Sequence, residues 1–244
     1  RVDYIVAISD FVKSTIINTY KINENKITVI NRGVDIKFFN TKVNNDNNFI
    51  NFLNKYNISS EKKIILYPGR LTEWKGQINF LKIMESYNDD KIICYFVGDN
   101  KNASYTSKLT SEINKRNLQQ NCKIIGHLSK EDLKMMYICA DIVISAPLKP
   151  EGFGRIISES LAMKKIILCY DYGGAKDQLN GLDKIYKVSP NDQSEMSNKI
   201  DKIIKLSKSQ KDNLGSISRE HVIENFSKEK MLEGYLNFYQ NIVL

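Results

Sequence analysis

Between residues 63 and 188, short apolar runs alternate with segments whose apolar positions have helical spacing. The runs are apolar at nearly every position, which predicts strands that are buried on both faces. Such strands, separated by helices, predict a parallel sheet covered by helices on both sides. We expect strands at 63–67, 92–97, 123–125, 142–145, 166–170 and 184–188, and helices at 77–87, 104–117, 130–139 and 153–162. The expected fold is an open, doubly wound α/β sheet.

Smaller units flank this alternation. An apolar run at 4–8, a helix starting at Ser9-Asp10 and a strand at 26–30 predict a β-α-β fragment. The Asn-rich stretch at 41–57 predicts a connector with one weakly amphipathic helix, and three helices are expected from residue 193 onward. The last helix carries an apolar stripe that we expect to be core rather than a cofactor site: Met231, Leu232, Tyr235, Phe238 and Tyr239. The expected division is a domain fragment, a connector, the main sheet domain and a final helix, at 1–40, 41–62, 63–226 and 227–244.

The chain has 244 residues and a formal net charge of +8, which raises the question of a nucleic-acid or anionic membrane partner. The positive residues are mostly lysines interspersed with acidic residues, without a dense Arg-rich or Lys-aromatic strip. A solvated surface is therefore the favoured interpretation, and nucleic acid is not an expected partner. An anionic ligand, or peripheral contact with a membrane, stays as the alternative.

Other bulk features narrow the class of protein. No apolar run approaches the ~18 to 20 residues that cross a bilayer, and the first residues do not resemble a signal peptide. The chain opens on Arg1 without a methionine, so we expect its start to be an internal cut. Widely spaced cysteines in apolar runs predict buried free thiols and a cytoplasmic location: Cys94, Cys122, Cys139 and Cys169. The two histidines, His127 and His221, lie far apart and do not suggest a metal site.

Doubly wound sheets bind ligands at the carboxyl ends of their strands. The loops that should surround one crevice follow Tyr67, Val97, Ile125, Ser145 and Tyr170.

The first of these loops contains Gly69, Arg70 and Lys75. A guanidinium can hold a phosphate through two parallel hydrogen bonds, and an ammonium adds a compact positive charge. The pair suits a diphosphate, although surface cations near an ordinary turn would look the same.

The loop after Ser145 leads into an expected helix through Glu151-Gly152-Phe153-Gly154-Arg155. Glycines at a helix start let a ligand approach backbone N–H groups, where the helix dipole favours negative charge. Glu159 is expected about two turns into the helix, roughly 10 Å from Glu151 along the axis. Each carboxylate could hold hydroxyls at one end of a sugar-diphosphate-ribose unit, or could belong to a solvated helix face.

Two further loops are weaker candidates. Gly173 and Gly174, followed by Asp177, could wrap a second phosphate or a sugar edge with their N–H groups, or could form only a turn. In the loop after the strand at 123–125, the backbone of Ile125 or Gly126 could meet a base. Ser129 and Asp132 look like a helix-capping arrangement just beyond it.

Taken in order, these motifs resemble those of retaining glycosyltransferases of family 4, which have the GT-B fold. The resemblance rests on Arg70 and Lys75 after a first strand, on Glu151-x-Phe-Gly with Glu159 eight positions later, and on the Gly-Gly loop beyond. It covers nearly the whole chain, and residues 1–35 are similar to the end of the family's N-terminal, acceptor-side domain. It implies a GT-B type sheet with a fragment of a second Rossmann-like domain and a last helix that returns to that domain.

The resemblance also implies residue roles. Arg70 and Lys75 would bind the diphosphate of a nucleotide sugar, and Glu159 would hold the ribose. Glu151 would be the catalytic residue that binds hydroxyls of the transferred sugar. The backbone beside it, together with Gly126, would complete the donor site: Gly152, Phe153, Gly154 and Arg155. The family transfers sugar with retention, by front-face attack without a protein nucleophile, and needs neither a metal nor another cofactor.

Two residues depart from the family pattern, Asp177 where glutamate is usual and Arg32 where Asn-Gly is usual. We also expect the front of the N-terminal domain, with the acceptor site, to be missing. The leading hypothesis is a cytoplasmic hexosyltransferase-type enzyme, acting in solution or at the inner face of a membrane on a glycan, lipid or small-molecule acceptor. The alternatives are a non-catalytic fragment that only binds a nucleotide sugar, and a basic protein that binds polyanions.

Overall fold

The computed structural model describes residues 3–42, 46–58, 61–87, 91–99 and 101–243. Within them the chain forms a six-stranded sheet and a separate two-stranded sheet. Arg1, on which the expectation of a cut start depends, and Leu244, the expected end of the last helix, lie outside the described residues. So do residues 43–45 and 59–60 of the expected connector.

The six-stranded sheet is parallel throughout, with the strand order β5-β4-β3-β6-β7-β8. Its strands are β3 (Lys63–Pro68), β4 (Ile92–Val97), β5 (Cys122–Gly126), β6 (Ile142–Ser145), β7 (Ile167–Tyr170) and β8 (Lys187–Val188). Every residue of β4, β6 and β7 is buried, as the unbroken apolar runs predict. The prediction of a doubly wound α/β fold is confirmed.

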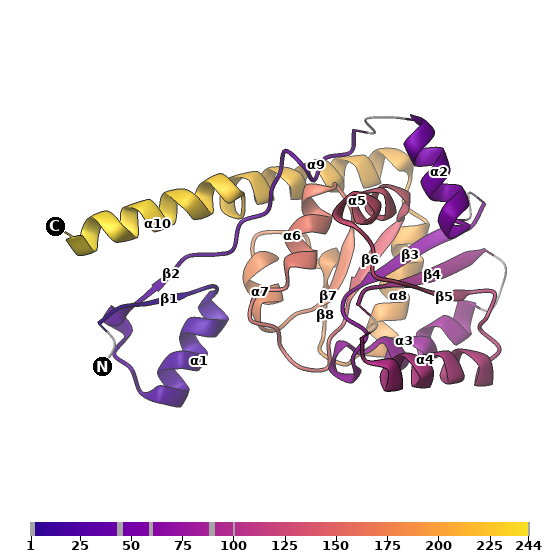
Figure 1. Cartoon of the computed structure of the whole chain (residues 1–244), viewed down its shortest axis with the longest axis horizontal. Coiled ribbons are helices and arrows are strands. Elements are labelled where there is room, and N and C mark those ends of the chain that lie inside the picture. Colours follow the sequence, from indigo (N-terminus) through magenta and orange to yellow (C-terminus); the bar gives the residue numbers. More distant parts are fainter. Residues whose placement is uncertain (1–2, 43–45, 59–60, 88–90, 100, 244) are drawn as a thin grey trace.

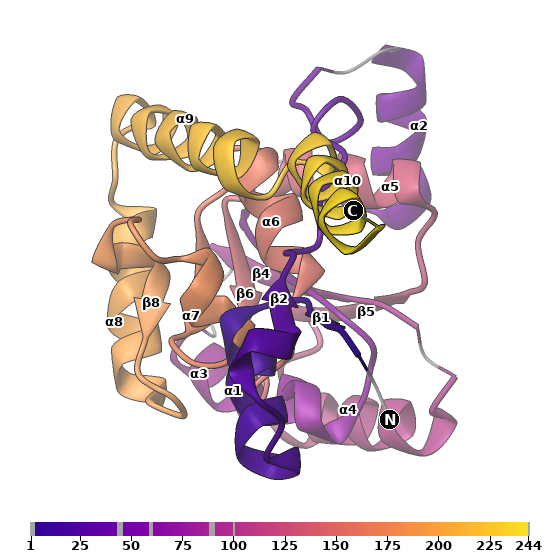
Figure 2. The same ribbon diagram turned by 90° about the vertical axis from the view of Figure 1, so that its left-hand side faces the viewer.

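Helices cover both faces of this sheet (Figures 1 and 2). One layer contains α3 (Gln77–Met84), α4 (Ala103–Lys115) and α8 (Gln193–Ile204), and the other contains α5 (Lys130–Cys139), α6 (Arg155–Ala162) and α9 (Lys208–Asn225). The short α7 (Gly174–Gln178) was not predicted. The prediction was also wrong at 184–186, which form a 3-10 turn before β8.

The start of α6 differs from the prediction of a helix at 153–162. Gly154 has φ +82°, which a right-handed helix does not allow, so α6 begins at Arg155. Glu151 therefore lies in a loop, and Glu159 is only about one turn into the helix. The estimate of ~10 Å along a common helix axis does not apply.

The two-stranded sheet is the predicted β-α-β fragment, with β1 (Ile5–Ala7), α1 (Asp10–Tyr20) and β2 (Ile27–Val29). Ser9 caps α1, because its Oγ accepts a hydrogen bond from the N–H of Val12 at 3.1 Å. The same hydroxyl donates to the carbonyl oxygen of Gly152. The carboxylate of Asp177 in α7 accepts from the N–H of Phe11 at 3.0 Å. The start of α1 thus docks onto the main sheet domain at the Gly152 loop and α7.

The Asp177 contact leads to a first prediction. Asp177→Ala should lower the free energy of unfolding by about 1 kcal/mol, because the N–H of Phe11 loses a capping-type acceptor. Urea denaturation measures this change. Asp212→Ala, at an exposed position in α9, should cost less than about 0.5 kcal/mol. Equal stabilities of the two variants would contradict a stabilising role for the contact.

The expected connector contains α2 (Asp46–Tyr56). This helix packs against α5: Phe52 is buried in the main core, and the hydroxyl of Tyr56 donates to Asp132 at 2.7 Å. The stretch therefore contributes to the core of the sheet domain.

The final helix α10 (Lys228–Val243) runs alongside β2 and away from the large sheet (Figure 1). The ring of Phe238 packs edge-on against Tyr4 at 6.2 Å between centroids. The expectation that the apolar stripe of this helix is core is wrong for the described chain, because Leu232 and Tyr239 are 47% and 58% exposed. No helix within the described residues combines the length and the apolarity that crossing a membrane requires.

Candidate functional site

The strand order reverses between β3 and β6, so the loops that follow these two strands diverge to opposite sides. A cleft of about 760 Å³ lies where they part, at the carboxyl ends of the strands. Parallel α/β sheets bind their ligands at such a reversal. The loops after β3, β4, β5 and β6 contribute to the lining, which agrees with four of the five loops expected around one crevice.

Most of the predicted site residues line this cleft: Gly69, Arg70, Lys75, Glu151, Gly152, Phe153, Gly154, Arg155 and Glu159. Four candidates that the sequence marked do not line it: Ile125, Gly126, Gly173 and Gly174. The next residues of the β5 loop, His127 and Leu128, take the place expected for Ile125 and Gly126. The loop after β7 does not line the cleft but packs against the backbone of Glu151 and Gly152, which do.

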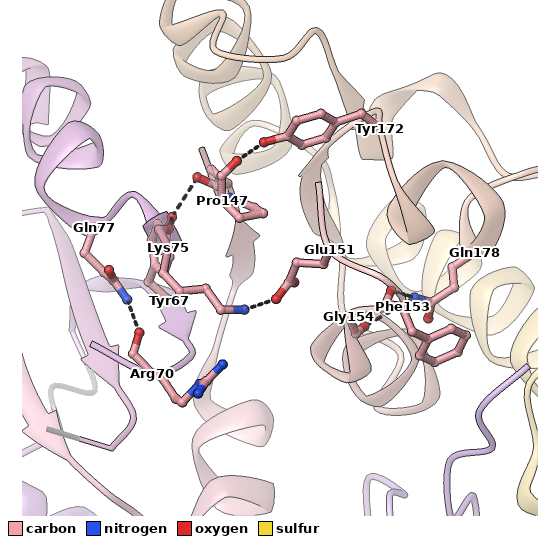
Figure 3. A network of polar contacts seen from close by, with 11 residues as sticks. Tyr67, Arg70, Lys75, Gln77, Pro147, Glu151, Phe153, Gly154, Tyr172 and Gln178 are labelled. Atoms are coloured by element: carbon pink, nitrogen blue, oxygen red, sulfur yellow. Dashed lines mark hydrogen bonds and ion pairs between the residues drawn. The ribbon is translucent and has the colours of Figure 1, made fainter. Parts of the chain in front are cut away.

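Lys75 and Glu151 face each other across the strand reversal, and the ammonium of Lys75 donates to a carboxylate oxygen of Glu151 (Figure 3). Only 10% and 15% of the two side chains are exposed. The Lys75 ammonium also lies over the ring of Trp74, 4.6 Å from its centroid, in a cation–π contact. Within the described residues the Lys75 ammonium has no other hydrogen-bond acceptor, so two of its three N–H donors remain for a ligand. The predicted phosphate-binding and sugar-binding residues are therefore ion-pair partners in the cleft.

Buried and half-buried side chains hold the two loops in place (Figure 3). The hydroxyl of Tyr67 lies within hydrogen-bonding distance of the carbonyl oxygens of Lys75, at 2.6 Å, and Ala146, at 3.2 Å. The amide of Gln77 donates to the carbonyl of Arg70 at 3.0 Å, and the hydroxyl of Tyr172 donates to that of Pro147. Backbone atoms near the cleft are thus fixed by groups that do not enter it.

Arg70 and the start of α6 are open to an incoming anion. The Arg70 side chain is exposed, and its guanidinium has no hydrogen-bond or ion-pair partner within the described part of the chain. Gly154, Arg155 and Ile156 bring the N-terminus of α6 to the cleft. Unpaired N–H groups and the helix dipole make such a terminus favourable for phosphate.

The Gly-Gly loop packs against the backbone that carries Glu151. The N–H of Gly174 donates to the carbonyl oxygen of Glu151 at 2.8 Å and is therefore not directed at a ligand. A Cβ atom on Gly173 would lie 2.7 Å from the carbonyl oxygen of Glu151, and one on Gly174 would lie 2.6 Å from that of Gly152. These glycines permit a close backbone approach, which favours the second of the two alternatives for this loop, a turn rather than a wrap around a second phosphate.

Glu159 accepts a hydrogen bond from the hydroxyl of Tyr137 at 3.1 Å. Burial raises the pKa of Glu159, while the Tyr137 hydroxyl and the charges of Arg155 and Lys130 act in the opposite direction. Burial also raises the pKa of Tyr137 well above its ordinary value, so the phenol stays neutral and remains a donor.

Several lining residues were missed by the sequence analysis. Asp99 lies in the loop after β4, separated from the strand by Gly98, and the rule that ligands bind at strand ends could have marked it. Trp74 could have been marked by its place next to Lys75. Ile8 and Arg32 reach the cleft from the N-terminal fragment, and only the docking of the two units reveals them.

A second cavity, of about 400 Å³, lies at the amino ends of the strands of the large sheet, where β3, β6 and β7 begin. Its lysines are scattered in the sequence and gather only in the fold: Lys63, Lys164, Lys165, Lys208 and Lys211. Asp141 partly neutralises them, pairing with Lys63 at 3.3 Å and with Lys211 at 3.8 Å. This basic cavity is separate from the cleft.

Over the described residues, no group of three or more histidine, cysteine, aspartate or glutamate side chains is arranged to hold a metal ion. Independence from metals and cofactors stays a prediction.

Comparison with known proteins decides the family. The family model for glycosyl transferases group 1 matches residues 48–221, which is more than half of the chain and includes all of the cleft except Ile8 and Arg32. The chain belongs to this family. Its solved relatives have GT-B folds, so the group 1 chain has the predicted GT-B type architecture.

Individual relatives agree with the assignment. A glycosyltransferase from Rickettsia africae is 33% identical and superposes with a TM-score of 0.92, over 99% of this chain and 64% of that protein. Anabaena HepE, solved in complex with UDP and glucose, has a TM-score of 0.86 at 20% identity, over 98% of this chain and 63% of HepE. Spore coat protein SA of Bacillus subtilis is 23% identical over 97% of this chain and 64% of its own length. This chain spans less than two thirds of the length of each of these proteins.

Proposed function

We propose that the cleft binds a nucleoside diphosphate sugar and that the protein transfers the sugar to an acceptor. The observation that carries the proposal is the Lys75–Glu151 pair at the strand reversal, beside Arg70 and the start of α6. Family membership supports it, as does the presence of UDP and glucose in the similarly folded HepE.

The site chemistry assigns a part of the donor to each group. Arg70, the two remaining N–H donors of Lys75 and the N-terminus of α6 would neutralise the diphosphate as it departs, which is electrostatic stabilisation of a developing charge. Glu151 would accept hydrogen bonds from sugar hydroxyls, and Glu159 from those of the ribose. His127 and Leu128 would lie nearest the base, in the role that the sequence assigned to Ile125 and Gly126.

The finer points of the proposal follow the sequence resemblance. We propose family 4 chemistry on a hexose, with retention. An acceptor hydroxyl attacks the anomeric carbon from the face that the diphosphate leaves, the bond from carbon to phosphate oxygen breaks with its electron pair on the diphosphate, and the acceptor proton follows to that oxygen. The proposed setting is the cytoplasm or the inner face of a membrane, and no metal is involved. Residues 1–40 and α10 would belong to an acceptor-side domain.

Isothermal titration with UDP-, GDP- and ADP-sugars tests donor binding. One nucleotide series should bind, and Arg70→Ala should weaken that binding about tenfold, because one charge-assisted hydrogen bond contributes about 1.5 kcal/mol or more. Arg116→Ala, which removes an arginine paired with Glu85 and Glu112 away from the cleft, should leave the affinity unchanged. Absence of binding to every nucleotide sugar would sink the proposal.

The same preparation separates an enzyme from a binding-only fragment. Donor hydrolysis or sugar transfer by the 244-residue chain would establish that these residues suffice for turnover of the donor. Nucleotide-sugar binding without turnover would support the non-catalytic alternative.

A further inference from the structure

One aromatic residue contacts the cleft without lining it. Tyr137 of α5 is fully buried, and its hydroxyl reaches across to α6, where it donates to Oε2 of Glu159. Glu159 lines the cleft and Tyr137 does not. The hydrogen bond therefore fixes a ligand-facing carboxylate from behind.

Tyr137 itself is held by the segment at 35–39, which crosses from β2 towards α2. The ring of Phe39 packs edge-on against that of Tyr137, 6.2 Å between centroids, and Phe39 is buried. The guanidinium of Arg219 anchors this segment by donating to the carbonyl oxygens of Phe39 at 2.7 Å and Ile36 at 2.9 Å. The phenol is thus packed between the segment at 35–39 and Glu159 of α6.

The same segment also contacts a lysine whose charge affects the ionisation of Glu159. The ammonium of Lys130 lies 4.0 Å from the ring centroid of Phe38, and the charge of Lys130 favours the ionised form of Glu159. Arg155, on the helix of Glu159, acts in the same sense. Among the described residues, the groups that favour the ionised form of this carboxylate are one neutral donor and two cations: Tyr137, Lys130 and Arg155.

A buried tyrosine often donates its hydroxyl to an acceptor that has only a structural role. Two observations favour a functional role. First, the acceptor is a carboxylate that lines the cleft. Second, the segment at 35–39 contacts both Tyr137, through Phe39, and Lys130, through Phe38.

We propose that Tyr137 is a positioning residue, which orients the Glu159 carboxylate for the ribose hydroxyls of the donor and is itself braced by the segment at 35–39. The proposal rests on the function proposed above. It assigns no chemical step to Tyr137, which acts only through Glu159.

The test is Tyr137→Phe, with Tyr186→Phe as the matched control. Tyr186 is also buried, and its hydroxyl bonds at 3.1 Å to the carbonyl of Leu214 and to the hydroxyl of Ser218, away from the cleft. Donor affinity, measured by titration calorimetry, should fall about tenfold in Tyr137→Phe and stay within twofold of the unaltered chain in Tyr186→Phe.

A double-mutant comparison isolates the route through Glu159. In a chain that already carries Glu159→Ala, adding Tyr137→Phe should change the affinity less than twofold. An equal loss in both backgrounds, or no loss from Tyr137→Phe alone, would overturn the proposal.

A ligand-free readout keeps the inference distinct from the proposed function. Removal of the phenol takes away a group that favours the carboxylate, so the NMR titration midpoint of Glu159 should move to higher pH in Tyr137→Phe and not in Tyr186→Phe. As the pH is lowered, donor affinity should then begin to fall at a higher pH in Tyr137→Phe than in the unaltered chain. An unchanged midpoint overturns the positioning contact even if donors bind. A raised midpoint in a chain that binds no nucleotide sugar supports the contact and overturns its role in donor binding.

Discussion

Replacing Lys75 by methionine should weaken binding of a nucleotide sugar roughly a hundredfold. The methionine keeps most of the apolar stem, but the cleft loses a cation that could donate to the diphosphate, and a charged hydrogen bond of this kind contributes up to about 3 kcal/mol. The same change leaves Glu151, whose side chain is 15% exposed, without its partner. We therefore expect the free energy of unfolding to fall by about 2 kcal/mol as well. Calorimetric titration and urea denaturation measure the two effects.

Lys108→Met is the matched control for this change. Lys108 pairs with Glu73 at 3.3 Å, but both side chains are mostly exposed, so its loss should cost well under about 1 kcal/mol and leave the affinity unchanged. Adding Glu151→Gln to Lys75→Met should restore stability, because no unpaired carboxylate remains, without restoring the affinity. Donor affinity within twofold of the unaltered chain in Lys75→Met would show that this ammonium does not bind the donor.

Gly173→Ala should lower the free energy of unfolding by about 3 kcal/mol or more and abolish measurable donor binding. Gly173 has φ 60° and ψ −150°, a conformation that essentially only glycine adopts. The added Cβ would also lie 2.7 Å from the carbonyl oxygen of Glu151 and 2.8 Å from the Cβ of Pro150. Relief of these contacts requires movement of the loop that carries Glu151, and crowding of this kind costs about 1–3 kcal/mol beyond the backbone strain.

Gly181→Ala separates contact from backbone strain. Gly181 also has a positive φ, +85°, but a Cβ atom there would meet nothing within 4 Å. Its replacement should cost only about 1 kcal/mol and leave donor binding intact. Thermal and urea denaturation of both variants, followed by titration of whichever remain folded, gives the comparison. Equal destabilisation would show that the contact with the Glu151 loop contributes nothing.

The sheet could be predicted well because its signal is local. The runs that became β3, β4 and β6 are apolar at successive positions, and such runs, separated by amphipathic segments, have few other ways to be buried. The start of α6 was less accessible, because a glycine is compatible with both a helix start and a left-handed turn. Only the packing of Gly154 beside Glu151 decides between them.

The candidate site could be predicted as far as it follows strand ends. Arg70 and Glu151 lie in the loops that leave the first and fourth strands of the sheet, and parallel strands bring such loops together. Tyr137 had no comparable signal, because its apolar neighbours make it look like ordinary core and the meeting of α5 and α6 depends on strand order. The stripe on α10 shows the opposite error: Leu232 and Tyr239 have helical spacing, but the described residues do not cover them.

In the cleft, the positive charge of Lys75 and the negative charge of Glu151 compensate each other. In the proposed mode of donor binding, a phosphate would take the place of the Glu151 carboxylate beside Lys75. A sugar hydroxyl would take the place of the Lys75 ammonium beside Glu151. A simple anion that approached Lys75 would have to compete with Glu151, whereas a molecule that offers an anion and hydroxyls at a fixed separation can replace both partners together. The pairing of Lys75 with Glu151 would then make the cleft selective for such a two-part molecule.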